Sequence, residues 1–270
     1  MADDTAPRLR TLKSLGQHFL SDKGIARRIV QAADVAEGDN VLEIGPGKGI
    51  LTEQLLAAGA HVTAIELDRG LYEGLCDHYR DHPRVALHHA DALKVDPAMA
   101  GAGYKVVANL PYQVTTPLLF HFLEAAPPPA CIVVMIQKEV ADRILAGPGD
   151  KIYGVLSLGV QARASGAMCF KVPPGAFRPP PKVTSAVIRV NPYAPEQAPV
   201  PPQRVAAFMQ VVRAALGQRR KTLGNALKGL KLPPEGVQQA LEACGIDPQT
   251  RGETLGLEEF AGLAERLFRN

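Results

Sequence analysis

An uncharged run, Asn109-Leu110-Pro111-Tyr112, begins at the last residue of an apolar segment with β-branched residues at 105–109. Such a segment is typical of a buried strand. In open α/β sheets, ligands bind in the crevice beyond the carboxyl ends of the strands. An amide, a proline and an aromatic ring side by side are an odd choice for a plain turn, so we take residues 109–112 as the candidate reaction centre.

A glycine-rich turn, EIGPGKGILT at 43–52, ends an earlier apolar segment. Its glycines, Gly45, Gly47 and Gly49, allow a tight turn and a close approach of a ligand to the backbone. The spacing excludes a P-loop, which requires Gly-x-x-x-x-Gly-Lys-Ser/Thr. It also departs from the dinucleotide fingerprint, because Ile50 stands where that motif needs a third small residue.

Acidic residues follow the next two apolar segments. Glu66 is placed to accept hydrogen bonds from two ribose hydroxyls, and Asp91 to accept one from the exocyclic amine of adenine. Each has a structural alternative, an N-terminal helix acid for Glu66 and a helix cap for Asp91. Together with the glycine turn they predict an adenosine ligand that lacks phosphates and carries a reactive group, which indicates S-adenosylmethionine.

With that cofactor, the 109–112 run acquires a chemical role. The activated methyl group mainly requires a nucleophile positioned in line. The Asn109 side-chain oxygen and a carbonyl near Leu110 can each accept one hydrogen of an adenine N6 amine, which frees the nitrogen lone pair. Pro111 fixes φ, and Tyr112 would stack on a base that has left its own stack. In the alternative, Asn109 bonds its own backbone and Tyr112 belongs to the core.

Alternating strands and helices must position these residues. Helical patterns, such as 50–59, separate short apolar runs and predict an α/β fold with a doubly wound, mostly parallel sheet. Two later runs without an intervening helix, 167–170 and 185–190, predict a hairpin with a late antiparallel strand. The five earlier runs are 40–45, 61–67, 85–91, 105–109 and 131–137.

A proline-rich stretch, 191–203, is typical of an extended linker and divides the chain near residue 200. We therefore expect a catalytic domain at 1–200 and a small all-α domain of about four short helices at 201–270. Between Glu196 and Glu235 the chain has seven basic residues and no acidic one. They form either a phosphate-binding face, with Arg219, Arg220 and Lys221 at its centre, or a solvated helical face.

The composition bounds the class of protein. The 270 residues are 46% hydrophobic and 21% charged, with a net charge of +3, which is ordinary for a globular protein. No apolar run approaches the ~20 residues that a membrane span needs, and no signal peptide is evident, so we expect a cytoplasmic protein. Four scattered cysteines fit reduced thiols. We expect no metal, since the adjacent His88 and His89 point to opposite faces of a strand.

The order of the motifs resembles the ribosomal RNA adenine N6-dimethyltransferase family, and is most similar to its bacterial small-subunit branch. The resemblance implies a Rossmann-like class I methyltransferase that dimethylates two adjacent adenosines in the 3′-terminal hairpin of 16S rRNA. It also implies a small-subunit precursor as partner, and we expect a monomer. The matching segments are 13–22, 43–52, 65–68, 109–120, 135–144, 177–190, 218–227 and 251–260.

The same resemblance implies roles for particular residues. Base stacking falls to Tyr112 and Phe177, although Phe177 has core packing as its alternative. The family usually has Asn where this chain has His18, whose imidazole can still donate or accept a hydrogen bond. The implied cofactor contacts are Gln17, His18, Leu20, Gly45, Gly47, Glu66, Asp91, Ala92 and Asn109.

Two other functions fit parts of the sequence. One is a methyltransferase acting on large-subunit rRNA, and the other is a ribosome-assembly or nucleic-acid-binding factor that keeps the fold without catalysis. The intact 109–112 run with Glu66 and Asp91 favours catalysis. The segment 218–227 and the C-terminal helical extension favour the small-subunit substrate.

Overall fold

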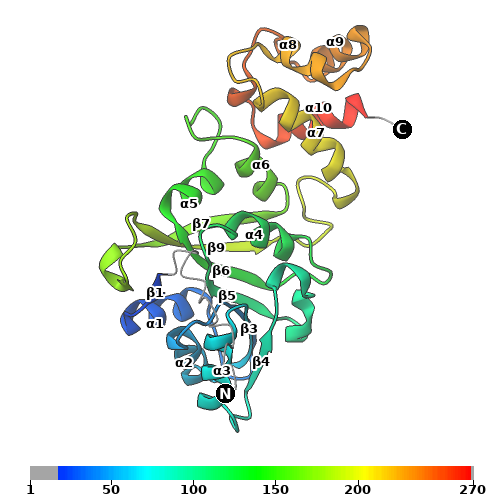
Figure 1. The fold of residues 1–270 in the computed structure, drawn as a ribbon. Coiled ribbons are helices and arrows are strands. Elements are labelled where there is room, and N and C mark those ends of the chain that lie inside the picture. Colours follow the sequence, from blue (N-terminus) through cyan, green and yellow to red (C-terminus); the bar gives the residue numbers. More distant parts are fainter. Residues whose placement is uncertain (1–17, 269–270) are drawn as a thin grey trace, which may run out of the picture.

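A computed structural model describes residues 18–268, and its centre is a seven-stranded sheet (Figure 1). The strand order is β4-β3-β2-β5-β6-β9-β7. The strands from β4 to β6 are parallel, and β9 runs antiparallel to both of its neighbours, so the predicted late antiparallel strand is confirmed. The strands are β2 (Asn40–Ile44), β3 (His61–Glu66), β4 (Val85–His89), β5 (Lys105–Asn109), β6 (Cys131–Gln137), β7 (Ala164–Val172) and β9 (Ser185–Pro192).

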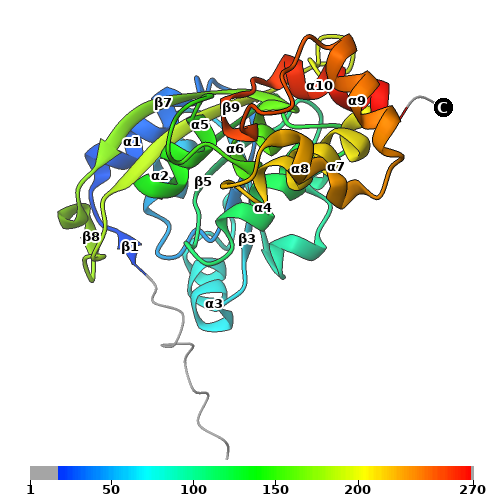
Figure 2. The ribbon, with the colours of Figure 1, turned by 90° about the horizontal axis from the view of Figure 1, so that it is seen from above.

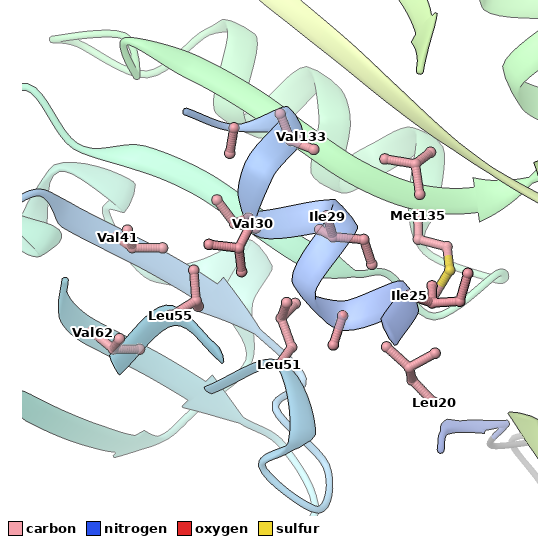
Figure 3. Close-up of a cluster of buried hydrophobic side chains, with 14 of the residues drawn as sticks. Leu20, Ile25, Ile29, Val30, Val41, Leu51, Leu55, Val62, Val133 and Met135 are labelled. Carbon is pink, nitrogen blue, oxygen red and sulfur yellow. The ribbon is translucent and has the colours of Figure 1, made fainter. Parts of the chain in front are cut away.

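Helices cover both faces of this sheet, which makes it doubly wound as predicted. On one face, side chains of α1, α2 and α3 pack in the core that contains Val41, Val62 and Val133 (Figure 3). On the other face, α4, α5 and α6 pack against Leu42 and Val134. These helices are α1 (Lys23–Ala32), α2 (Ile50–Ala57), α3 (Arg69–His78), α4 (Thr115–Leu123), α5 (Lys138–Leu145) and α6 (Val155–Gln161).

The strand residues divide between the two cores by alternation, because successive side chains of a strand point to opposite faces. In β6 the first six residues are all buried, with Val133 and Met135 on one face and Ile132 and Val134 on the other. A central strand covered on both faces therefore reads as a continuous apolar run. This pattern made the strands visible in the sequence.

A two-stranded sheet forms beside the hairpin of β7 and β9. The proline-rich loop between those strands contains β8 (Phe177–Arg178), which pairs antiparallel with β1 (Phe19–Leu20) (Figure 2). Ser21 reinforces the pairing, since its N–H and its hydroxyl both donate to the Ala176 carbonyl. The pairing holds the first described residues of the chain beside residues 176–179.

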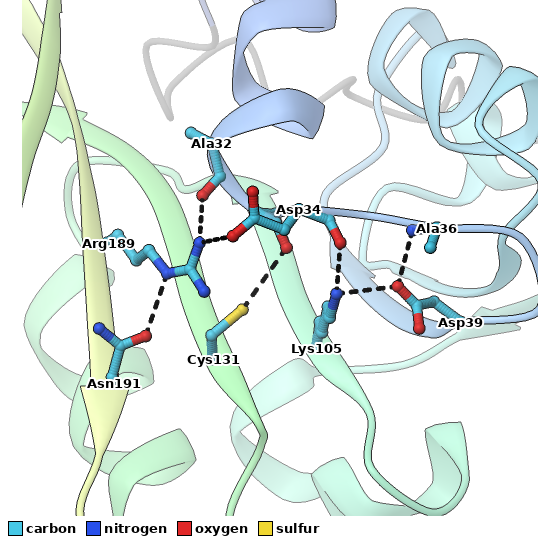
Figure 4. Close-up of polar contacts among 9 residues, drawn as sticks. Ala32, Asp34, Ala36, Asp39, Lys105, Cys131, Arg189 and Asn191 are labelled. Atoms are coloured by element: carbon cyan, nitrogen blue, oxygen red, sulfur yellow. Dashed lines mark hydrogen bonds and ion pairs between the residues drawn. The ribbon is translucent and has the colours of Figure 1, made fainter.

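A polar network ties α1 to the sheet at the amino ends of the parallel strands (Figure 4). Arg189 binds the Asp34 carboxylate and donates to the Ala32 carbonyl at 2.9 Å. Lys105 donates to the Asp34 carbonyl at 2.6 Å and to Asp39 Oδ2 at 2.8 Å. The network lies at the end of the sheet opposite the carboxyl ends of β2, β3 and β5. It therefore stabilises the fold at a place distant from the candidate site.

The last four helices have a separate core and lie at one end of the molecule, next to α6 (Figure 1). Phe208 and Phe260 meet at its centre with their ring planes at 83°. Tyr153 and Leu158, from the loop before α6 and from α6 itself, also belong to this core. The helices are α7 (Val205–Leu216), α8 (Leu223–Leu227), α9 (Pro234–Ala243) and α10 (Leu257–Leu267), which confirms the predicted helical C-terminus. Within residues 18–268, no helix has the length and apolar character of a membrane span.

Candidate active site

One cavity of about 240 Å³ opens at the carboxyl ends of the parallel strands. Loops that follow β2, β3, β4 and β5 line it, together with His18 and Phe19 from the start of the described chain. The sheet order places these strand ends next to one another. The predicted residues that line the cavity are His18, Gly45, Gly47, Glu66, Asp91, Ala92, Asn109, Leu110, Pro111 and Tyr112.

The glycine turn forms one wall of the cavity. Gly45 and Gly47 have φ angles of +63° and +60°, a left-handed conformation that side chains rarely adopt. A Cβ at Gly45 would meet no protein atom within 4 Å, so the backbone there faces open space that a ligand can approach. At Gly47, a Cβ would lie 3.1 Å from the Phe19 ring, which packs directly over the turn.

Glu66 is 5% exposed and is held by backbone groups at the end of β3. Gly47 N–H donates to its Oε2 at 3.1 Å, and Asp68 N–H donates to its Oε1 at 2.9 Å. Burial raises the pKa of Glu66, while these backbone hydrogen bonds act in the opposite direction. The alternative role as a helix acid falls to Asp68, whose side chain caps α3 by accepting from Leu71 N–H.

Asp91 combines the two roles that the sequence left open. Its Oδ1 accepts from Leu93 N–H at 3.1 Å and caps a short 3₁₀ helix, Ala92–Lys94. Asp91 also lines the cavity, and its Oδ2 lies 3.8 Å from Lys94 Nζ. The cap fixes the orientation of the carboxylate without using all of its acceptor sites.

Asn109 ends β5 and lines the cavity. Among residues 18–268 its side chain has no hydrogen-bonding partner, so the alternative in which Asn109 bonds its own backbone does not hold. Leu110 is 1% exposed and its N–H donates to the Met135 carbonyl at 3.1 Å. The Pro111 carbonyl accepts hydrogen bonds from Val114 N–H and from the hydroxyl of Thr115, the first residue of α4.

Tyr112 lines the cavity, and its hydroxyl is engaged by a residue that does not line it. The hydroxyl forms a 2.7 Å hydrogen bond with Ser185 Oγ. Burial raises the pKa of Tyr112, so the phenol stays protonated at neutral pH. The ring centroid lies 6.1 Å from that of His18, whose Nδ1 is 2.8 Å from the Pro179 carbonyl oxygen.

Among residues 18–268, two of the predicted catalytic and cofactor-binding residues do not line this cavity. Phe177 is 1% exposed and packs in the core with Leu20, so in this structure it takes the core-packing alternative rather than a stacking position. Leu20 is 7% exposed and also belongs to that core, and its neighbour Phe19 lines the cavity instead. The pairing of β1 with β8 turns both side chains inward. Gln17 lies outside the described residues.

Sequence reasoning missed the apolar rim of the cavity. Leu67 is 55% exposed and Leu93 is 37% exposed, and both line the cavity beside the strand-end acids. Exposed leucines in contact with a cavity are suited to packing on the faces of a planar ring. A signal was present, because each leucine follows its acid by one or two residues in the chain.

The predicted basic cluster lies in the turn after α7. Arg219 is already engaged, since its Nε lies 3.1 Å from Glu253 Oε2 and its Nη2 donates to the Tyr153 carbonyl at 3.4 Å. Arg220 and Lys221 are exposed. Arg219 therefore ties this turn to the loop before α6 although it is itself exposed, and its two neighbours are exposed without such an ion pair.

The arrangement fits a nucleoside-bearing cofactor. Glu66 has about four acceptor sites as a carboxylate, so it can still accept hydrogen bonds from hydroxyl groups that enter the cavity. Gly45 leaves space beside the backbone, and the two leucines offer apolar contact to a base. This site, on a seven-stranded sheet with one antiparallel strand and helices on both faces, defines a class I methyltransferase.

Comparisons with known proteins identify the family. The family model described as ribosomal RNA adenine dimethylase matches residues 8–268. The ribosomal RNA small subunit methyltransferase A of Clostridium perfringens is 47% identical over 261 residues, which cover 96% of this chain and 91% of that one. The protein of that name from Geobacter metallireducens is 43% identical over 267 residues, covering 96% of each chain. The chain belongs to the ribosomal RNA adenine dimethylase family, whose enzymes take methyl groups from S-adenosylmethionine.

Solved structures agree with this assignment. A dimethyladenosine transferase from Plasmodium falciparum superposes with a TM-score of 0.77 at 26% identity, covering 91% of this chain and 96% of that one. The 23S rRNA methyltransferase ErmE superposes with a TM-score of 0.72 at 26% identity, covering 92% and 99%. The likeness to both extends over the helical C-terminus as well as the sheet.

Proposed function

We propose that this enzyme adds two methyl groups to N6 of each of two adjacent adenosines in the 3′-terminal hairpin of small-subunit rRNA. One observation carries the proposal. Asn109, whose side chain has no hydrogen-bonding partner among residues 18–268, lines one cavity together with the buried Glu66 and with Tyr112. The identity of 43–47% to enzymes named for the small subunit supports this substrate over the large-subunit alternative.

The cofactor would be held by the strand-end acids and the glycine turn. Glu66 accepts from the two ribose hydroxyls, Asp91 accepts from the adenine amine, and Leu67 and Leu93 contact the faces of that base. Gly45 lets the backbone approach the rest of the molecule. When bound, S-adenosylmethionine supplies a methyl group already activated on its sulfonium, so this chain needs no strong general base beside it.

Asn109 and Leu110 would prepare the nucleophile. The lone pair of an adenine amine is delocalised into the ring, which makes the nitrogen a weak nucleophile. The Asn109 side-chain oxygen and the Leu110 carbonyl oxygen each accept one N6 hydrogen and favour a pyramidal nitrogen with an available lone pair. Pro111 restricts φ and helps to fix that carbonyl. The proton that leaves the methylated nitrogen passes to solvent.

The Tyr112 ring would stack on the substrate adenine after the base has left its helix. Phosphates of the flanking RNA would contact Arg220 and Lys221 in the helical unit, which we place at residues 201–270. A ribosomal substrate places the work of this enzyme in the cytoplasm, as a monomer that acts on small-subunit precursors. The presence of Asn109, Glu66 and Tyr112 in the lining of one cavity supports catalysis over a purely architectural role.

The test is a methyl-transfer assay with purified protein and radiolabelled S-adenosylmethionine. Small and large ribosomal particles that lack the modification are compared in parallel. We expect label on the small particle, in adenosine dimethylated at N6. Asn109→Ala should lower kcat by about 10²- to 10³-fold because the nucleophile loses a positioned acceptor.

The matched control is Gln238→Ala, which removes an exposed amide on α9 that donates to Glu242. This control should transfer methyl groups at the wild-type rate, and both variants should bind RNA as wild type does. Full activity in Asn109→Ala would refute the mechanism. Label on the large particle alone would assign the enzyme to the other substrate class.

A further inference from the structure

Tyr112 and Ser185 are 73 positions apart in the chain, yet their hydroxyls form one short hydrogen bond of 2.7 Å. Strand β5 leads into Tyr112 and pairs with β6, and β6 pairs on its other side with β9, which begins at Ser185. This order brings the two residues together. Ser185 is fully buried and does not line the cavity. Of these two residues, Tyr112 is therefore the one that a ligand in the cavity can contact.

Ser185 is a rigid anchor. It is the first residue of β9 and pairs with Gln137 of β6 on one side and with Val172 of β7 on the other, so its backbone belongs to the middle strand of a three-stranded antiparallel segment. Its side chain is fixed relative to that sheet. A hydroxyl in this place can hold its partner more firmly than one on a loop.

Strand β6 also sets the position of Asn109. Asn109 pairs with Met135, which is two residues before Gln137, the partner of Ser185. Residues two apart along a strand, and paired residues on neighbouring strands, share one face of a sheet. The Asn109 amide and the anchor of the Tyr112 hydroxyl therefore lie on the same face, at a separation fixed by two residues of β6.

We infer that Ser185 is a positioning residue for the methyl transfer, which acts by holding the Tyr112 ring at a set distance from the Asn109 amide. The inference rests on the proposed stacking of Tyr112 on the substrate adenine. A ring held in place loses less conformational freedom when the base arrives, so the stacked complex forms more readily. The same bond gives a physical reason for tyrosine rather than phenylalanine at position 112.

The experiment is a double-mutant cycle on the full-length enzyme, with unmodified small ribosomal particles as substrate. Ser185→Ala and Tyr112→Phe each remove the hydrogen bond from one side and keep the ring. Each should lower kcat/KM for the particle about three- to tenfold, which is the usual worth of one such bond. The double variant should be no worse than either single one, because one bond is lost in all three.

Further measurements separate positioning from general damage. The affinity for S-adenosylmethionine should be unchanged in every variant of the cycle. Ser157→Ala is the matched control, since Ser157 is an equally buried serine on α6 that donates to the Arg143 carbonyl. It should leave kcat/KM unchanged even where it lowers the melting temperature. If Ser185→Ala does not fold, Tyr112→Phe alone tests the bond from its half-buried side.

The outcomes are distinct. Additive losses in the double variant, or unchanged kcat/KM in Tyr112→Phe, would overturn the role of Ser185. Tyr112→Ala addresses the underlying proposal, since removing the ring should lower kcat/KM by about 10-fold to 200-fold for one lost stacking contact. Wild-type kcat/KM in that variant would refute stacking itself. A loss in Tyr112→Ala with none in the other variants would refute only the positioning by Ser185.

Discussion

Thr52 donates a hydrogen bond of 2.7 Å to Glu43 inside the protein, behind the glycine turn. Both side chains are buried, Glu43 at 1% exposure on β2 and Thr52 at 0% on α2. Burial raises the pKa of Glu43 from its ordinary value of 4.5 to about 8, with a contribution from the nearby Glu66 and an opposing one from the Thr52 bond. At neutral pH, Glu43 is therefore a neutral acid that links strand and helix.

This protonation makes stability depend on pH. The folded chain holds a proton on Glu43 that the unfolded chain releases above pH 4.5, so this group lowers stability as the pH rises from about 5 to 8. The slope approaches about 1.4 kcal/mol per pH unit within that window. The Glu43→Gln variant has a neutral side chain at this position at every pH. Its free energy of unfolding relative to wild type should therefore increase with pH up to about 8.

Urea unfolding of both proteins at pH 5.5 and pH 8 measures that difference. Glu235→Gln, which alters an exposed carboxyl on α9, serves as the control and should remain parallel to wild type at both pH values. Parallel behaviour of Glu43→Gln would contradict the buried neutral acid.

Gly47→Ala should weaken cofactor binding as well as stability. Alanine at a φ of +60° costs about 1–2 kcal/mol, and its Cβ would press on the Phe19 ring beside the cavity. Gly38→Ala is the matched control, because Gly38 has a φ of +83° and an added Cβ there meets nothing within 4 Å. Titration calorimetry with S-adenosylmethionine should show about a tenfold loss for Gly47→Ala and none for Gly38→Ala. Equal affinities of the two variants for S-adenosylmethionine would show that Phe19 is not part of the cofactor site.

Glu66→Gln should lower the affinity for S-adenosylmethionine by about 10- to 100-fold. The amide keeps the shape but offers one acceptor oxygen, so either a backbone N–H or a ligand hydroxyl loses its partner. The same calorimetric titration measures this loss. RNA binding should not change, and a variant with wild-type cofactor affinity would remove Glu66 from the cofactor site.

The basic turn after α7 should divide into two functions. The double variant Arg220→Ala, Lys221→Ala should weaken RNA binding and reduce the slope of log K against log[salt] by about 1.5. Arg219→Ala should mainly lower the melting temperature, because Arg219 is engaged by Glu253 and the Tyr153 carbonyl. It should change the salt slope less than the double variant does. The half-exposed ion pair itself contributes no more than about 1 kcal/mol.

Filter binding of rRNA at several salt concentrations, with thermal melts in parallel, tests this division. Cofactor affinity should be the same in all of these variants. A salt slope that falls as much in Arg219→Ala as in the double variant would show three equivalent phosphate contacts.

The central strands β5 and β6 were predictable because each is a short, covered run with apolar residues on both faces, as in 131–136 of β6. Glu66 and Asp91 were also predictable, since strand ends of a doubly wound sheet meet at one crevice. These inferences use only local sequence and one topological rule. They required no knowledge of which side chains touch.

The remaining features depend on contacts between distant parts of the chain. β1 and β8 are two residues long each and have no periodicity, so nothing in the sequence indicates that they pair. That pairing buries Leu20 and Phe177 and exposes Phe19 to the cavity. Likewise, the partner of Arg219 is Glu253, which lies 34 positions away on the far side of two helices.

The late position of β9 in the chain has a consequence for biosynthesis. A nascent chain completes the glycine turn, Glu66, Asp91 and Asn109 well before Ser185 leaves the ribosome, because synthesis proceeds from the amino terminus. The strand that carries Phe19 likewise cannot pair until residues 177–178 have been synthesised. An emerging chain therefore contains the glycine turn and the strand-end residues of the cavity before it contains Ser185, the hydrogen-bonding partner of Tyr112. The enzyme becomes competent for its own RNA target only after the hairpin of β7 and β9 has been made.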